Sequence, residues 1–159
     1  MRDIRKLAKN LGLCQDWQKK MKDAPTLQEY CQMFFDGSDW AMENDFPSLG
    51  LLRKYKEASI YGLYTDAKTV KRNLIKIAFF GLSDAILSYD GHIVSEIYVR
   101  HKSTVKITAK DNAILFVTMA DNATVEINVQ DNAVVNIYRY GGTITGTGNI
   151  NINERSWKK

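Results

Sequence analysis

The triplet Asp-Asn-Ala occurs three times at an interval of ten residues, beginning at Asp111, Asp121 and Asp131. Similarity at a fixed interval indicates a repeat architecture, in which each unit folds alike and stacks on its neighbour. With the aspartate as position 1 of each decade, positions 5, 7 and 9 are mostly apolar back to the decade of Ile75, Ile77 and Phe79. This alternation predicts half-buried strands joined by short corners.

Two arrangements of these strands fit the period: an antiparallel β-meander and a parallel β-solenoid. Three-residue Asp-Asn-Ala loops keep the meander possible, because they preserve which face each apolar set occupies. The outward positions favour the solenoid, since their character returns every 20 residues rather than every ten: position 4 is apolar at Val94, Ile114 and Val134 but threonine at Thr104 and Thr124. We therefore predict an α+β chain in which short N-terminal helices pack on a C-terminal parallel β-solenoid, with two strands per coil of about 20 residues.

The repeated triplet is expected to form the corners of the coils. Asp and Asn tolerate the left-handed backbone region that a sharp reversal needs, and Ala provides a small inward side chain. Stacking of coils would place Asn112 above Asn132 as an amide ladder, and Asp111 above Asp131 in a pair that is solvated or holds a cation. The predicted corner residues are Asp111, Asn112, Asp121, Asn122, Asp131 and Asn132.

One outer face of the solenoid is predicted to be polar and the other apolar. The apolar face is too large to be left exposed without a purpose, so it is the candidate interaction face. Either the N-terminal helices cover it or a second copy of the chain does, and the need of those helices for a partner favours the first. Its residues are Val94, Tyr98, Ile114, Phe116, Val134, Tyr138 and Tyr140.

The first third of the chain reads as short helices. Apolar stripes at spacings of three and four lie before Gly12 and again from Cys14 to Met21, and Thr26 with Glu29 forms a capping-box signature. Further short helices are expected from Ser38 and Ser48. The predicted organisation is a helical cap over 1–58, a transition segment over 59–73, the solenoid over 74–153 and a basic tail over 154–159.

The charge and the cysteine content limit which partners and which cellular compartment are expected. The net charge is +4, and residues 1–80 hold 14 Lys/Arg against 10 Asp/Glu while residues 81–159 hold eight of each. The basic helices, with Lys19, Lys20 and Lys22, leave nucleic-acid binding as an alternative. The two cysteines, Cys14 and Cys31, read as small buried hydrophobes, with one disulfide as the other possibility. With neither a secretory signal nor a membrane span, a cytoplasmic protein or a phage-particle component is expected.

The sequence offers little support for catalysis. His92 and His101 lack the spacing of metal ligands, and nucleophile-elbow, P-loop and dinucleotide-binding patterns are absent. The nine-residue glycine-rich period of calcium-binding solenoids is missing too. We expect no catalytic residue, cofactor or metal site and no enzyme, although a small carbohydrate-binding or carbohydrate-active β-helix stays open as an alternative.

A family resemblance rests on three motifs: "SEIYVRH" at Ser95–His101, the Asp-Asn-Ala triplets, and "NIYRYGG" at Asn136–Gly142. In these the chain resembles small uncharacterised proteins of gut Bacteroidetes and their phages. The resemblance implies no activity and no functional residue. The leading hypothesis is therefore a non-enzymatic structural or protein-interaction module, which uses its apolar solenoid face to bind itself or another protein.

Overall fold

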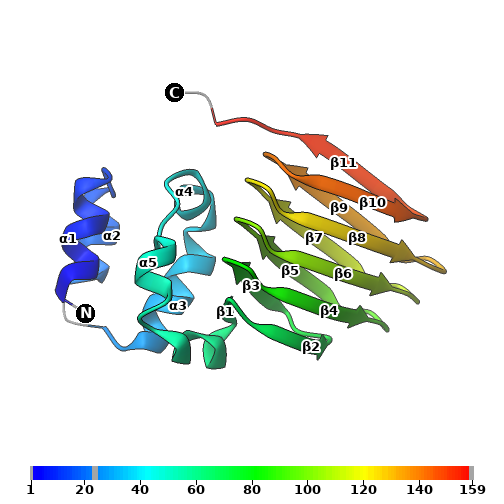
Figure 1. Ribbon diagram of the computed structural model, residues 1–159, viewed down its shortest axis with the longest axis horizontal. Helices are drawn as coiled ribbons and strands as arrows, with labels where there is room; N and C mark the ends of the chain where they lie inside the picture. The colour runs from blue at the N-terminus through cyan, green and yellow to red at the C-terminus, as the bar shows by residue number, and fades with distance from the viewer. Residues whose placement is uncertain (1, 23–24, 158–159) are drawn as a thin grey trace. The chain divides into compact units, whose positions relative to one another are not determined.

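The computed structural model describes residues 2–22 and 25–157. Short helices precede a series of parallel strands that form a β-solenoid, so the chain has the α+β fold that its sequence predicts. The chain divides into two compact units, one ending at Tyr61 and the other beginning at Gly62 (Figure 1). Each unit is described separately below.

The helices of the first unit lie where the apolar stripes predict them. The helices are α1 (Arg2–Asn10), α2 (Gln15–Lys20), α3 (Leu27–Asp36), α4 (Ser38–Glu43) and α5 (Leu49–Leu52), followed by the 3₁₀ helix η1 (Lys56–Tyr61). At the start of α3 both halves of the capping box form, because the Thr26 hydroxyl accepts the Glu29 N–H while the Glu29 carboxylate accepts the Thr26 N–H. After α1 the chain turns at Gly12, whose φ of 82° suits glycine.

A small apolar core holds the first helices together. Ile4, Ala8, Leu13 and Met21 are buried in it, and Trp17 and other aromatic side chains pack around them. Of the two free cysteines, Cys31 is buried as expected, and burial raises the pKa of its thiol to about 11. The prediction for Cys14 is wrong, because this residue is exposed at the N-cap of α2, whereas Met21 of the same apolar stripe is buried.

The second unit consists of two parallel sheets. The strands are β1 (Leu63–Thr65), β2 (Lys68–Arg72), β3 (Lys76–Phe80), β4 (Asp84–Tyr89), β5 (Val94–Val99), β6 (Thr104–Ala109), β7 (Ile114–Met119), β8 (Thr124–Val129), β9 (Val134–Arg139), β10 (Thr143–Thr147) and β11 (Ile150–Glu154). Within the described residues a six-stranded sheet has the order β1-β3-β5-β7-β9-β11, and a five-stranded sheet has the order β10-β8-β6-β4-β2. Successive strands along the chain thus alternate between the two sheets (Figure 1).

The strand register confirms the 20-residue coil and excludes the meander. Ile114 in β7 pairs with Val94 and with Val134, and Val125 in β8 pairs with Val105, always through parallel ladders. The first and last coils are shorter, because Leu63 pairs with Ala78 and Ile150 pairs with Val135 at an offset of 15 residues. Strands β1 and β2 of the first coil lie in the segment 59–73 that precedes the regular repeat.

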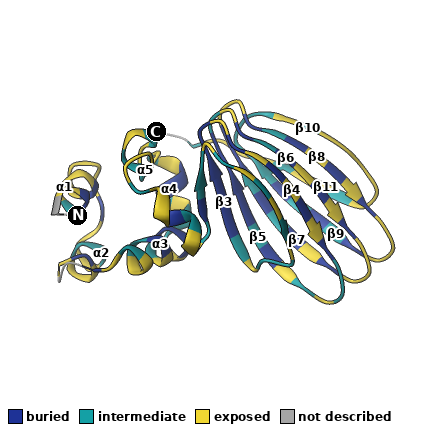
Figure 2. Cartoon of the chain, turned by 60° about the horizontal axis from the view of Figure 1, so that its bottom comes forward, coloured by how far each residue is buried: buried dark blue, intermediate teal, exposed yellow. Residues whose placement is uncertain are grey.

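The solenoid core is made by the inward residues of both sheets. Figure 2 shows buried stretches along strand after strand, and the alanines that follow the corners, Ala113, Ala123 and Ala133, are fully buried. One sequence prediction fails here: Ile75 is 67% exposed, while its neighbour Leu74 packs against the core. The cause is the shortened first coil, since the corner at Asn73 moves the start of β3 to Lys76.

The last coil depends on glycine. A Cβ atom at Gly142 would lie 2.3 Å from the Ala123 oxygen, and one at Gly148 would lie 2.1 Å from the Val129 oxygen. Both glycines also have φ near +95°, where other residues are strained. Glycine therefore lets a coil of fewer residues close on the coil beneath it.

Candidate functional site

The predicted interaction face is the outer surface of the six-stranded sheet. Val94, Ile114 and Val134 are direct neighbours across β5, β7 and β9, and they form one row across the strands. Phe116 lies in the next row between Glu96 and Asn136. Tyr98 and Tyr138 belong to the row after that, with Thr118 between them, and Tyr140 follows β9. All seven predicted residues therefore lie on one face of one sheet or at its edge.

Exposure divides this face into two parts. Val94 is 52% exposed and Ile114 is 39% exposed, and Val134 and Phe116 beside them are half-buried. Tyr98, in contrast, is only 7% exposed, and its hydroxyl donates to Glu96 Oε2 at 3.2 Å. The accessible apolar surface is thus the row of Val94, Ile114 and Val134 together with Phe116, which we call the exposed row. Coverage of the face by the N-terminal helices stays a prediction.

The C-terminal segment, which the sequence marks only as basic, lies against one end of this face. The Trp157 ring stacks on Tyr140 with centroids 4.0 Å apart and planes 10° from parallel. The Arg100 guanidinium lies 5.8 Å from the Trp157 ring centroid, and that of Arg155 lies 5.7 Å from the Tyr138 ring centroid. Part of the predicted face is thus occupied by the chain itself, and sequence reasoning missed this.

The corners form two rows along the solenoid. The Arg100 corner row contains the corners that lead from the six-stranded to the five-stranded sheet, at Asp66, Gly81, His101 and Asp121. The Asp131 corner row contains the return corners at Asn73, Gly91, Asp111 and Asp131. All eight residues have φ between 49° and 69°, as the left-handed prediction for corner aspartates requires.

Consecutive coils are linked by the corner side chains. Asp131 Oδ2 accepts the Asp111 N–H at 3.1 Å, and Asp111 Oδ2 accepts the Gly91 N–H at 2.9 Å. The sequence predicts an amide ladder of Asn112 and Asn132 in this place, but the bridging group is the aspartate carboxylate. The reason is that position 1, not position 2, adopts the left-handed conformation, which brings its side chain to the preceding coil.

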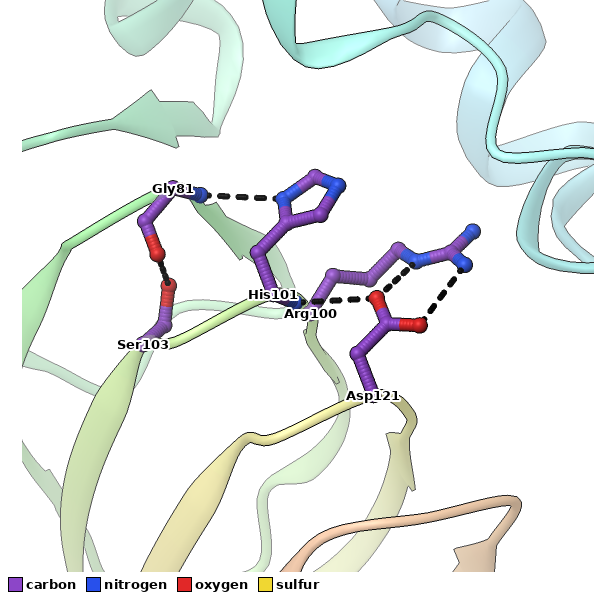
Figure 3. Close-up of polar contacts among 5 residues, drawn as sticks. All are labelled: Gly81, Arg100, His101, Ser103 and Asp121. Atoms are coloured by element: carbon purple, nitrogen blue, oxygen red, sulfur yellow. Dashed lines mark hydrogen bonds and ion pairs between the residues drawn. The ribbon is translucent and has the colours of Figure 1, made fainter.

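The most densely bonded corner joins Arg100, His101 and Asp121 (Figure 3). The Asp121 carboxylate accepts Arg100 Nε–H at 3.1 Å and the His101 main-chain N–H at 3.1 Å. His101 Nδ1 in turn accepts the Gly81 N–H at 3.0 Å, and the Ser103 hydroxyl donates to the Gly81 carbonyl at 3.3 Å. Three successive coils are therefore connected through one chain of hydrogen bonds.

Opposing effects set the ionisation of Asp121. Burial favours the neutral acid, but the Arg100 hydrogen bonds and positive charge, with the His101 N–H, outweigh it and hold the pKa of Asp121 below its ordinary value of 3.8. The Arg100 side chain is only 6% exposed, so the ion pair balances a charge that is largely removed from water. The hydrogen bonds of Arg100, His101 and Asp121 therefore connect neighbouring coils and have a structural role.

The outer face of the five-stranded sheet is polar, as predicted. Thr104 and Thr124 are neighbours across β6 and β8, and Lys106 and Glu126 are neighbours in the next row. Val70 and Ile86 are exposed exceptions on β2 and β4. In the part of the chain that the structure describes, no group of three or more His, Cys, Asp or Glu side chains is placed to hold a metal ion.

The basic helices make local contacts with some of their charges. Lys19 lies 4.0 Å from Asp16, and the Lys20 ammonium lies 4.3 Å from the Trp17 ring centroid. These contacts are exposed and weak, so the lysines stay accessible to an anion. Nucleic-acid binding by Lys19, Lys20 and Lys22 stays a prediction.

No helix among the described residues is both long enough and apolar enough to cross a membrane. Comparison of the chain with protein-family models, with curated proteins and with solved structures finds no match.

Proposed function

We propose that this chain is a non-enzymatic protein-interaction module, in which the solenoid is a rigid platform and the exposed row binds a protein partner. The observation that carries the proposal is the exposure of Val94 and Ile114 as direct neighbours on parallel strands, beside the half-buried Val134 and Phe116. When a partner removes the apolar side chains of a sheet face from water, the free energy of the system falls, which favours binding.

The rigidity of the platform supports this role. The strands beneath the exposed row carry fully buried side chains such as Ile97, Val117 and Val135, and each strand is held on both sides by parallel ladders. A surface that does not reorganise loses little conformational entropy on binding. The partner expected here presents an apolar strip of similar length with polar groups at its rim, since Lys76 and Glu96 flank the row with their charged groups 3.9 Å apart.

The test compares Ile114→Lys with Ile86→Lys, which alters an exposed isoleucine on the outer face of the five-stranded sheet. A photo-crosslinking residue placed at Val94 in each background would be irradiated in extracts of the source cells. We expect one protein to be crosslinked in the wild-type and Ile86→Lys backgrounds, and at least about tenfold less of it with Ile114→Lys. Equal crosslinking in all three backgrounds would contradict the proposal.

Self-binding through the same row is distinguished by light scattering. The double variant Phe116→Lys with Tyr138→Lys should convert an assembled species to a folded monomer if a second copy is the partner. Unfolding of a monomeric protein by the same change would instead indicate that these two side chains, both half-buried, support the fold itself.

A further inference from the structure

The two ends of the solenoid are built differently. At the N-terminal end, strand β2 carries Lys68, Lys71 and Arg72. Lys71 occupies an inward position, in register with buried Leu87, and its ammonium lies 5.9 Å from the Tyr64 ring centroid. An inward-pointing lysine on an edge strand prevents another strand from pairing there, because pairing would bury its charge.

Among the residues that the structure describes, the C-terminal end has no such protection. Strand β10 contains no charged residue, and the one charged residue of β11, Glu154, lies 3.5 Å from Arg139 of the strand beneath. Ile152 of β11 is in register with fully buried Ile137, yet it is 49% exposed because no coil covers it within the described chain. An apolar residue in an inward position at an open edge is a site for further stacking.

At this end, each sheet has main-chain N–H and C=O groups that point along the solenoid axis, away from the coil beneath. The Arg155 N–H donates to Arg139, and the Asn149 carbonyl accepts the Val135 N–H, so the odd-numbered residues of β11 bond to β9. Since a strand alternates the side to which its main-chain groups point, the N–H and C=O groups of Ile150 and Ile152 face away from β9. The Thr143 N–H likewise donates to Ala123, which leaves the groups of Ile144 facing away from β8.

As far as Trp157, the last residue that the structure describes, the C-terminal segment does not close this end. After β11 the chain returns along the outer face of the six-stranded sheet, where Trp157 stacks on Tyr140 and lies near Arg100 of an earlier coil. Two strand edges, one in each sheet, therefore remain at the same end of the solenoid. A partner must satisfy both edges at the spacing of two packed sheets, roughly 10 Å.

We propose that the C-terminal end of the solenoid binds the C-terminal end of a second copy of this chain, with β10 and β11 pairing antiparallel across a two-fold axis. A second solenoid end offers two edges at the matching spacing, whereas an extended peptide would satisfy one edge and leave the other unpaired. A two-fold arrangement closes on itself. Head-to-tail stacking would instead place β2 on β10, the two edge strands of the five-stranded sheet, and bury the charge of Lys71.

The apposed surface is small, about one coil in cross-section, so the dimer is expected to be weak, with a dissociation constant on the order of 10–100 μM. Sedimentation equilibrium from about 5 to 500 μM would measure it. We expect Ile152→Lys to weaken association at least about tenfold, because an unpaired ammonium would then be buried between the ends. Ile86→Lys is the matched control, since Ile86 has the same 49% exposure but lies away from the end, and it should leave association unchanged.

A second measurement needs no substitution. Amide hydrogen exchange of Ile150, Ile152 and Ile144 in the wild-type chain should slow as concentration rises through the same range, because these N–H groups acquire acceptors only in the dimer. Wild-type protein that is monomeric at 500 μM (about the highest practical concentration), or exchange that does not depend on concentration, would overturn the proposal. So would association that Ile114→Lys abolishes and Ile152→Lys does not, because the exposed row would then be the self-interface.

Discussion

The two corner rows of the solenoid perform the same task with different residues. The Asp131 corner row repeats Asp111 and Asp131, both exposed, and each carboxylate accepts one main-chain N–H from the preceding coil. The Arg100 corner row has His101 and Asp121 in equivalent places and adds the nearly buried guanidinium of Arg100. What His101 and Asp121 share with Asp111 and Asp131 is a left-handed backbone and a side chain that accepts the N–H of the preceding coil.

A corner residue must meet two separate requirements: its backbone must adopt a positive φ, and its side chain must suit the groups around it. Every corner needs a positive φ, and the open corners accept Gly, Asn, Asp or His. The Arg100 corner row carries a second constraint, since the nearly buried cation of Arg100 is paired with the Asp121 carboxylate. The following changes test whether these two requirements are separate.

The largest effect is expected where the corner has no space for a side chain. Gly148→Ala, between β10 and β11, places a Cβ atom 2.1 Å from the Val129 oxygen, whereas Gly91→Ala, at the corner between β4 and β5, meets nothing within 4 Å. Both changes strain a positive φ, so Gly91→Ala should cost about 1 kcal/mol, and Gly148→Ala about 3 kcal/mol or more. Urea unfolding monitored by circular dichroism measures both, and equal losses would show that the last coil can relax.

The next effect isolates the buried charge. Asp121→Asn keeps an oxygen that can accept the His101 N–H but removes the negative charge that faces the Arg100 guanidinium at this corner. Because Asp121 is 36% exposed and water screens part of the pair, we expect a loss of about 2 kcal/mol. The matched change Asp131→Asn, at an exposed corner, should cost less than about 0.5 kcal/mol. A larger loss at Asp131 than at Asp121 would contradict the distinction between the rows.

The same ion pair predicts a pH dependence. The folded pKa of Asp121 lies below its unfolded value, so the pair stabilises the fold above the unfolded pKa and this contribution is lost as pH falls through the folded pKa. The stability difference between wild type and Asp121→Asn should therefore be constant at neutral pH and shrink below about pH 4. Urea titrations at several pH values measure it, and a difference that does not shrink as the pH falls would contradict the charge as its cause.

How much of this could be predicted depends on whether a feature repeats. The period of ten residues, the 20-residue recurrence of the outer faces and the Thr26 capping box are local patterns, and each predicts its element correctly. Features of the irregular first and last coils are different. The exchange of Leu74 and Ile75 follows from a shortened coil, whose length no periodicity reveals.

The site illustrates the same limit. Arg100 stands at an outward position of its decade, and the ten-residue repeat alone assigns it no role. Its partner Asp121 is 21 residues later, so a 20-residue coil would have placed the two side chains together at neighbouring corners. The return of Trp157 onto Tyr140 carries no such signal, because the segment after β11 belongs to no repeat.

The smallest effect tests whether the corner requirement is truly shared. His101→Asp places in the Arg100 corner row the residue that the other row uses, and its carboxylate could accept the Gly81 N–H that His101 Nδ1 accepts now. We expect a change within about 0.5 kcal/mol, whereas His101→Ala, which removes the acceptor and favours the left-handed region less, should cost about 1–2 kcal/mol. Thermal unfolding at pH 7 would resolve the two. If aspartate were as costly as alanine, the imidazole ring, 6.1 Å from that of Phe80, would matter for its packing rather than for its acceptor, and the corners would follow no common rule.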